Sequence, residues 1–324
     1  MHRGRFLLIA VGLSAFTLIA SACANSNTGG SSGGGSTSSA PAANTVCASV
    51  DTSGTDLLAR ICKQGAIRVA TDQKYKPQSW YDVKTGEWKG FDVDVAREVA
   101  KRLGVTADIN HQDWEVITAG SWNDRWDISV GSMTDTVPRE KLFSFTPPYY
   151  YTPAGFAVYK TNTSVQDVTT DLDGKKICVG VSTTYEDYLK GDLVLGGTAP
   201  PFQFVVDNPD IVTFTTDTDA LDELALGDGV RCDAAMTATP TIQAYVDAGG
   251  KVKSVGDPIY YEPLCMAFDK NDPVDNKSLV DAVSTIVDDM HSDGTLTDLS
   301  MKWYHTDLTS TSASGASGSS SASG

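Results

Sequence analysis

The sequence holds few of the residues from which metal centres, redox sites and nucleic-acid interfaces are built. Its 324 residues include only four histidines and six cysteines, and no two cysteines have the C-x-x-C spacing of a zinc or redox site. Lysine and arginine number 25 against 41 acidic residues, which gives a net charge of −16. Nucleic acids and anionic membrane surfaces are therefore unfavourable partners, and neither a metal nor a cofactor is expected.

Catalytic motifs are also missing from the sequence. There is no G-x-S-x-G, P-loop or H-E-x-x-H segment, and the run GDGVRC at 227–232 lacks the third glycine of a dinucleotide-binding loop. Binding is therefore a simpler hypothesis than catalysis.

A long apolar run occurs at the N-terminus, over residues 6–20. It is too short and too early for a reliable membrane span, and the basic residues before it and small residues after it predict a signal peptide over 1–22. Ile19 to Cys23 look like a bacterial lipobox, so Cys23 is expected to carry a lipid and become the new N-terminus. The alternative is simple cleavage that leaves a free thiol.

Two segments have the composition of flexible chain. Residues 23–44, which follow the signal peptide, are rich in serine and glycine, and the Ser/Gly/Ala tail at 309–324 has the same character. Such composition cannot bury enough apolar area to order itself. We expect a flexible tether and a disordered tail.

The residues between these segments alternate between strand and helix patterns. The clearest helix runs from Gly90 to Val105, with an apolar stripe at Val95, Val99 and Leu103. Strands are expected before it at 66–72 and after it at 105–114 and 126–133, with a further helix at 115–125. This order predicts an α/β fold with mostly parallel strands. The length exceeds what one core usually supports, so two lobes are expected.

Four motifs in a fixed order carry a family resemblance: AIRVATDQKYKPQSW, GFDVDVAREVAKRLGV, HQDWEVI and DISVGSMTDTVPREKLFSFTPPYY. From about Leu57 to Leu308 the chain resembles the extracellular solute-binding proteins of family 3, the ligand-capturing subunits of ABC importers for polar amino acids. The resemblance implies a periplasmic-binding-protein-like fold of type II, with two mostly parallel sheets, a two-crossover hinge and an interlobe cleft. Lobe one would comprise 45–158 and the returning helices at 264–308, and lobe two 159–263. Monomers are usual in this family.

The same resemblance implies a ligand-binding site. Arg139 matches the arginine that holds the ligand's carboxylate, with Gly131, Ser132 and Thr134 in the preceding turn. Asp72 matches a polar contact, and Tyr75 and Trp114 match aromatic residues that pack against the ligand. From lobe two, Thr183 and Thr184 match donors that complete the carboxylate's shell, although Ser182 stands where a glycine is common. A buried carboxylate needs such pairing, and an arginine supplies two parallel bonds.

One departure from the family pattern concerns the ligand's ammonium group. Relatives that bind α-amino acids usually carry D-A-x-x-x-D late in the last strand of lobe two, and here Ala238 replaces the final aspartate. A buried ammonium without a carboxylate is costly. Either another acid substitutes, with Asp72, Glu186 and Asp217 as candidates, or the ligand lacks a standard α-ammonium.

Cysteine pairing also follows from the resemblance and from spacing. Without Cys23 five cysteines remain, so one thiol is left over. Cys47 and Cys62 are close in sequence and are expected to pair. Cys178 and Cys232 lie at strands that the family fold makes neighbours, and a bond between Cys265 and Cys232 is the rival.

These observations predict a lipid-anchored, extracytoplasmic binding protein. It would capture a small polar, carboxylate-bearing solute, an amino acid or a derivative, and present it to an ABC permease and its ATPase. Two alternatives use the same scaffold. One is an enzyme that resembles the cyclohexadienyl dehydratases, with Glu186 as its general acid, and the other is a ligand-sensing module.

Overall fold

The computed structural model describes residues 44–310, except 198 and 200. The predicted signal peptide, the lipid site at Cys23, nearly all of the tether and the tail from 311 lie outside the described residues. The helices of this part are α1 (Leu57–Gln64), α2 (Phe91–Leu103), α3 (Trp114–Thr118), α4 (Thr184–Lys190), α5 (Asp217–Leu224), α6 (Thr239–Asp247), α7 (Lys277–Ser292) and α8 (Thr295–Tyr304), with 3-10 turns η1 (Val46–Ala48) and η2 (Arg139–Lys141). The strands are β1 (Ala66–Thr71), β2 (Lys74–Tyr75), β3 (Ser79–Asp82), β4 (Glu87–Lys89), β5 (Thr106–His111), β6 (Ile128–Thr134), β7 (Phe143–Phe145), β8 (Tyr150–Tyr159), β9 (Lys176–Gly180), β10 (Asp210–Phe214), β11 (Ala234–Ala238) and β12 (Val252–Asp269).

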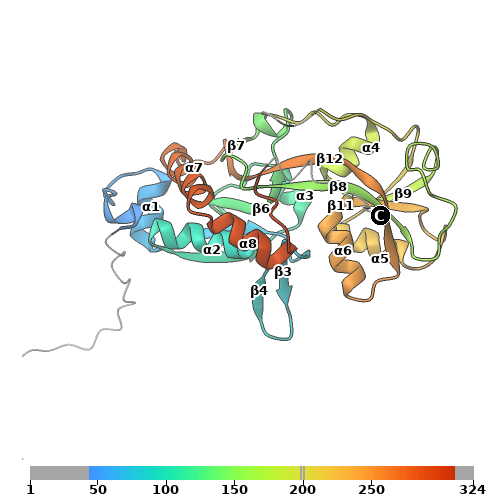
Figure 1. Ribbon diagram of the computed structural model, residues 1–324. Coiled ribbons are helices and arrows are strands. Elements are labelled where there is room, and N and C mark those ends of the chain that lie inside the picture. The colour runs from blue at the N-terminus through green and yellow to red at the C-terminus, as the bar shows by residue number, and fades with distance from the viewer. Residues whose placement is uncertain (1–43, 198, 200, 311–324) are drawn as a thin grey trace, which may run out of the picture. The chain divides into compact units, whose positions relative to one another are not determined.

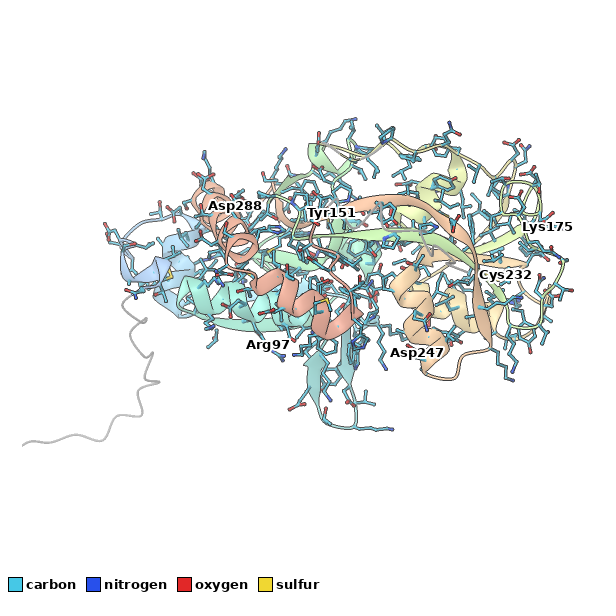
Figure 2. All side chains as sticks on the ribbon, in the orientation of Figure 1. Arg97, Tyr151, Lys175, Cys232, Asp247 and Asp288 are labelled. Atoms are coloured by element: carbon cyan, nitrogen blue, oxygen red, sulfur yellow. A yellow bond between two sulfur atoms is a disulfide. The ribbon has the colours of Figure 1, made fainter. Side chains whose placement is uncertain are left out.

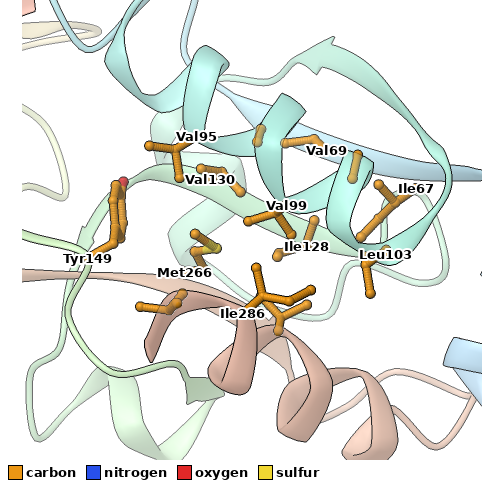
Figure 3. Packing of buried hydrophobic residues seen from close by; sticks show 14 of the residues in the cluster. Ile67, Val69, Val95, Val99, Leu103, Ile128, Val130, Tyr149, Met266 and Ile286 are labelled. Atoms are coloured by element: carbon orange, nitrogen blue, oxygen red, sulfur yellow. The ribbon is translucent and has the colours of Figure 1, made fainter. Parts of the chain in front are cut away.

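Lobe one is built around three parallel strands. β5 and β6 flank β1, and α1, α2, α7 and α8 gather on this part of the sheet (Figure 1). The predicted helix is present as α2, where Val95, Val99 and Leu103 join one hydrophobic cluster with Ile67 of β1 and Ile286 of α7 (Figure 3). The helix ends at Leu103 because the next residue, a glycine, has a left-handed backbone (φ 91°).

Lobe two repeats the arrangement with strands from later in the chain. β9 lies between β10 and β11 and runs parallel to both. Ile177 and Val179 belong to the hydrophobic cluster on one face of β9, while Cys178 belongs to the cluster on the other face. The sheet is therefore covered on both sides, as expected for parallel strands.

Strands β8 and β12 connect the two lobes. They pair with each other in antiparallel fashion, while β12 also pairs with β6 of lobe one and β8 with β11 of lobe two. The two-lobed α/β fold with two crossovers is thus confirmed. The sheets of the lobes are joined into a single nine-stranded sheet, a continuity that the sequence pattern did not reveal. The predicted boundaries at 158 and 263 fall within these two strands and stay a prediction.

Two local elements differ from expectation. Residues 74–89 form a small antiparallel sheet of β2, β3 and β4, which was not predicted and extends from lobe one (Figure 1). The helix expected over 115–125 is only α3, which ends at Thr118. It stops because Gly120, Ser121, Asn123 and Asp124 all have positive φ, which no α-helix can contain.

The two predicted disulfide pairs are confirmed. Disulfides join Cys47 to Cys62 and Cys178 to Cys232, and Cys232 lies in lobe two (Figure 2). Cys265, the rival partner, is buried and free. Within residues 44–310, no helix has the length and apolar character needed to cross a membrane.

Gly90 sets how closely α2 approaches the loop that leads from β2 to β3. Its φ is 130°, and a Cβ added there would lie 2.1 Å from the carbonyl oxygen of Gln78. The amides of Phe91 and Asp92 donate to carbonyls of this same loop, those of Pro77 and Gln78. Close backbone approach is therefore part of the start of the helix.

We predict that Gly90→Ala destabilises the protein by about 3 kcal/mol, because the methyl group collides with backbone that cannot move away cheaply. Gly65→Ala is the matched control, since Gly65 also has positive φ (73°) but a Cβ there meets nothing within 4 Å. Its cost should be only about 1 kcal/mol. Urea unfolding followed by circular dichroism measures both, and equal losses would contradict the role given to the close approach.

Candidate functional site

A cleft between the lobes contains the residues that the sequence predicted. Its free volume in this conformation is about 30 Å³, and it is partly open to solvent. The predicted residues all line it: Asp72, Tyr75, Trp114, Gly131, Ser132, Thr134, Arg139, Thr183 and Thr184. The remaining lining residues are Tyr185, Thr215, Thr216, Asp217 and Glu262.

Arg139 is the cation of the cleft. It begins η2, and its side chain is buried, with 7% of the residue exposed. Nη1 donates to the carbonyl of Thr134 at 3.1 Å and Nη2 to the carbonyl of Ser182 in lobe two at 2.9 Å. Burial lowers the pKa of Arg139, but guanidinium stays protonated in proteins. A charged fork therefore stands where the two lobes meet.

The aromatic ring of Trp114 lies beside this guanidinium. Cζ of Arg139 is 5.5 Å from the ring centroid, and the indole Nε1 of Trp114 donates to the carbonyl of Ser182 at 3.1 Å. Ser182 itself has a left-handed backbone (φ 60°). Serine here adopts the conformation that the family's glycine would favour, and its carbonyl reaches the cleft.

The side chains of Thr183 and Glu186 organise the start of α4. Thr183 caps the helix, because its Oγ1 accepts from the amide of Glu186 and donates to the carbonyl of Gly180 at 2.7 Å. Glu186 accepts from the amide of Ser182 at 2.6 Å and pairs with Lys190 at 2.7 Å. Glu186 does not line the cleft, so its carboxylate serves this turn.

The hydroxyl of Ser132 is held by a buried acid. Its Oγ donates to Asp92 Oδ2 at 2.7 Å and lies 2.6 Å from the hydroxyl of Tyr150, while Tyr149 donates to the other oxygen of Asp92 at 2.7 Å. Burial raises the pKa of Asp92 to about 6. At neutral pH Asp92 is therefore mostly ionised and accepts the hydrogen bond of Ser132, so this hydroxyl can act toward the cleft as an acceptor rather than as a donor.

Glu262 of β12 joins both lobes through one oxygen. Its Oε2 accepts from Thr134 of lobe one at 2.5 Å and from Thr184 of lobe two. The residue is 1% exposed, and its other oxygen, Oε1, has no well-formed hydrogen bond within the described residues. Burial raises the pKa of Glu262. Hydrogen bonds from the hydroxyls of Thr134, Thr184 and Tyr185 lower it in part.

Two aspartates complete the polar lining. Asp72 follows β1 and accepts from the amide of Lys74 at 2.8 Å, and burial raises its pKa to about 6. Asp217 is the first residue of α5, and burial, reinforced by the charges of Asp72 and Glu262, raises its pKa to about 8. Its Oδ1 is buried without a well-aligned partner among the described residues. Within the same part of the chain, no cluster of acids, histidines or cysteines could hold a metal ion.

Asp217 lies close to the position where the family's acid is missing. Ala238, the last residue of β11, is fully buried and does not line the cleft. Its neighbour Thr237 interacts with the carboxyl group of Asp217, and a Cβ on Gly180 of β9 would lie 2.7 Å from Asp217 Oδ1. An acid from α5 thus reaches the ends of β9 and β11.

Further contacts hold the lobes together around the cleft. Lys74 of lobe one pairs with Asp219 of lobe two at 3.0 Å, and the hydroxyls of Tyr75 and Tyr185 lie 3.4 Å apart. On another side, residues 135–137 pair with residues 194–196 through a β-bridge and backbone hydrogen bonds of 2.9 and 3.0 Å. The cleft is therefore closed in this conformation.

The sequence did not single out Glu262, Tyr185, Thr215 or Thr216 as ligand contacts. For Glu262 a signal existed, because an acid stands among apolar residues at the start of the segment EPLCMAF, where the chain returns to lobe one. Tyr185 follows a predicted contact, and Thr215 and Thr216 follow the end of β10. Polar residues at such positions are also common in ordinary loops, so the sequence did not distinguish them.

Known proteins match most of the chain. The family model for bacterial extracellular solute-binding proteins, family 3, matches residues 67–306. The L-cystine-binding protein TcyJ of Escherichia coli is 28% identical over 254 residues, 78% of this chain and 88% of that relative. The probable amino-acid-binding protein YxeM of Bacillus subtilis is 28% identical over 245 residues, with 74% and 84% covered.

Solved structures show the same kinship. The ancestral amino acid-binding protein AncCDT-1, described as a precursor of cyclohexadienyl dehydratase, shares 31% identity at a TM-score of 0.64, with 76% of this chain and 99% of that one covered. An ancestral arginine-binding protein bound to arginine shares 28% identity at a TM-score of 0.63, with 74% and 98% covered. The matched range, the two-lobed fold and the interlobe cleft agree, and the chain belongs to the bacterial extracellular solute-binding proteins, family 3.

Proposed function

We propose that this protein captures an α-amino acid or a close derivative in its cleft and delivers it to the permease of an ABC importer. The observation that carries the proposal is a buried guanidinium, that of Arg139, in a cleft whose other ionisable lining groups are carboxyls and two tyrosine hydroxyls. One cation and several acids in the same cleft suit a zwitterion. The named relatives TcyJ and YxeM are binding proteins, which favours binding over the dehydratase alternative.

Arg139 would hold the ligand's carboxylate. A guanidinium has five N–H groups, and two of its nitrogens donate to the carbonyls of Thr134 and Ser182. The N–H groups left over can form a charge-assisted pair with a carboxylate. The predicted hydroxyl contacts all donate to protein acceptors, those of Ser132, Thr134, Thr183 and Thr184. We therefore assign the carboxylate to the guanidinium and to backbone amides.

Asp217 would hold the α-ammonium in place of the acid missing at Ala238. Its buried Oδ1 lacks a well-aligned donor, and a carboxyl group in that state gains most from an ammonium. Asp72, which also lines the cleft, would supply the second acceptor. An amino acid is then recognised through acids on both lobes.

Closure would couple binding to transport. Arg139 and Trp114 of lobe one meet the carbonyl of Ser182 in lobe two, so a ligand held at Arg139 stabilises the closed form through both lobes. The permease would receive this form. The predicted lipid on Cys23 would keep the protein at the outer face of the cell membrane, beside the permease.

The first test removes the guanidinium. In the chain expressed from residue 24, Arg139→Ala should weaken binding of any amino-acid ligand at least about 100-fold, because a buried carboxylate loses its charged partner. Arg97→Ala, an exposed residue of α2 (Figure 2), is the matched control and should bind like wild type. Calorimetric titration against a panel of amino acids measures both, and unchanged binding in Arg139→Ala would refute the site.

The second test uses pH. In the free protein the pKa of Asp217 is about 8, so at pH 7 this carboxyl is mostly protonated, and binding an ammonium must release the proton. Affinity should therefore fall as pH drops below 8, by up to about tenfold per unit until the pKa of the complex is reached. Asp72, with a pKa of about 6, adds to the fall only at lower pH.

Asp217→Asn should weaken binding at pH 8.5 and flatten the dependence between pH 8 and 6.5. The same variant should raise the melting temperature of the ligand-free protein at pH 9, because ionising this buried acid disfavours the folded state as pH rises. Calorimetry in buffers of different ionisation enthalpy counts the released proton. A wild-type affinity that does not change across this range would contradict the assignment of the ammonium.

A further inference from the structure

The two carboxylate oxygens of Glu262 have different surroundings, and its contacts between the lobes involve only one of them. One oxygen accepts both interlobe hydroxyl bonds, from Thr134 and Thr184. Glu262 lines the cleft, and its other oxygen is buried without a well-formed hydrogen bond among the described residues, while the hydroxyl of Tyr185 interacts with this carboxyl group. Two hydroxyls need only a neutral acceptor, so a glutamine would serve the interlobe contact without burying a charge.

The balance of charges in the cleft also indicates that Glu262 lacks a cationic partner. Its lining includes one guanidinium, Arg139, and three carboxyls, those of Asp72, Asp217 and Glu262. A ligand carboxylate on Arg139 and one α-ammonium between the aspartates leave Glu262 unmatched. Buried charges are normally paired, so the cleft has room in its charge balance for a second cation.

We propose that Glu262 is a specificity residue that accepts a second ammonium or guanidinium group, carried by the side chain of the amino acid. This rests on the proposed function, since it assumes an amino acid held at Arg139. The ligand is then a basic amino acid or a diamino acid of the cystine type, rather than a neutral one.

The position of Glu262 makes this contact sensitive to closure. The residue lies on β12, one of the two strands that run through both lobes, opposite Thr152 of β8. Its Oε2 contacts reach Thr134 and Thr184, one on each lobe. A cation on Oε1 therefore meets a carboxylate that is fully oriented only when both lobes contribute their hydroxyls.

The experiment compares ligands that differ by one charged group. L-lysine and L-norleucine have side chains of similar length, and only lysine carries the second ammonium; L-arginine and L-cystine test the two other sources of such a group. In the full folded chain from residue 24, we expect lysine, arginine or cystine to bind at least about 100-fold tighter than norleucine. Glu262→Gln should reduce that ratio at least about tenfold.

Glutamine keeps an acceptor for Thr134 and Thr184, and the ratio of two affinities in one variant removes any general loss of folding. Glu87→Gln, at an exposed glutamate of β4 with 64% side-chain exposure, is the control and should keep the wild-type ratio. A wild-type protein that binds norleucine as tightly as the cationic ligands, or a ratio unchanged in Glu262→Gln, would overturn the inference while amino-acid binding stands. Binding of no amino acid, or binding that survives Arg139→Ala, would overturn the proposed function itself.

Discussion

The arrangement of the cleft depends on placing one guanidinium out of water between two lobes. Arg139 is buried, so its donors need acceptors, and they find backbone carbonyls from Thr134 in its own lobe and Ser182 in the other. The bond to Ser182 forms only between the two lobes, so the closed conformation supplies one of the acceptors that the buried guanidinium requires. A ligand carboxylate would accept a stronger hydrogen bond from the guanidinium than a carbonyl does, because both partners would then be ionised. In the proposed function, closure and carboxylate recognition would therefore depend on the same group, Arg139.

The strands that join the lobes also position groups that line the cleft. Strands β8 and β12 pair with each other and with strands of both lobes, so residues near their middle lie where the lobes meet. Glu262 occupies such a place, and the hydroxyl of Tyr150, at the start of β8, contacts the hydroxyl of Ser132. The hydrogen bond of Ser132 to Asp92 then links the cleft to the first turn of α2. Gly90, just before that turn, fixes its distance from the loop after β2. The site thus rests on the packing of lobe one.

Sequence patterns predicted the elements with strong periodicity and the residues that follow strand ends. The apolar stripe of α2, the alternation of strands and the order of motifs led to the correct fold, and each residue predicted from the motifs lines the cleft. What remained hidden depends on contacts between segments far apart in sequence. The direction of the Ser132 hydroxyl is set by Asp92, which precedes it by 40 residues. The early end of α3 was not predicted, because Ser121, Asn123 and Asp124 adopt a left-handed backbone. Their residue types permit this conformation but do not identify it in the sequence.

The substitution at Ala238 shows why a missing motif residue is a weak argument about chemistry. An ammonium requires a carboxylate at a point in space, and that point can be reached from a neighbouring element. Asp217, at the start of α5, extends to the ends of β9 and β11, where the side chain of Thr237 interacts with it. Its raised pKa is the physical cost of keeping an acid in that place without a bound cation. Structural stability alone would favour an apolar residue there, so the presence of Asp217 beside Asp72 and Glu262 fits a role of the three acids in binding the proposed ligand rather than in packing the lobes together.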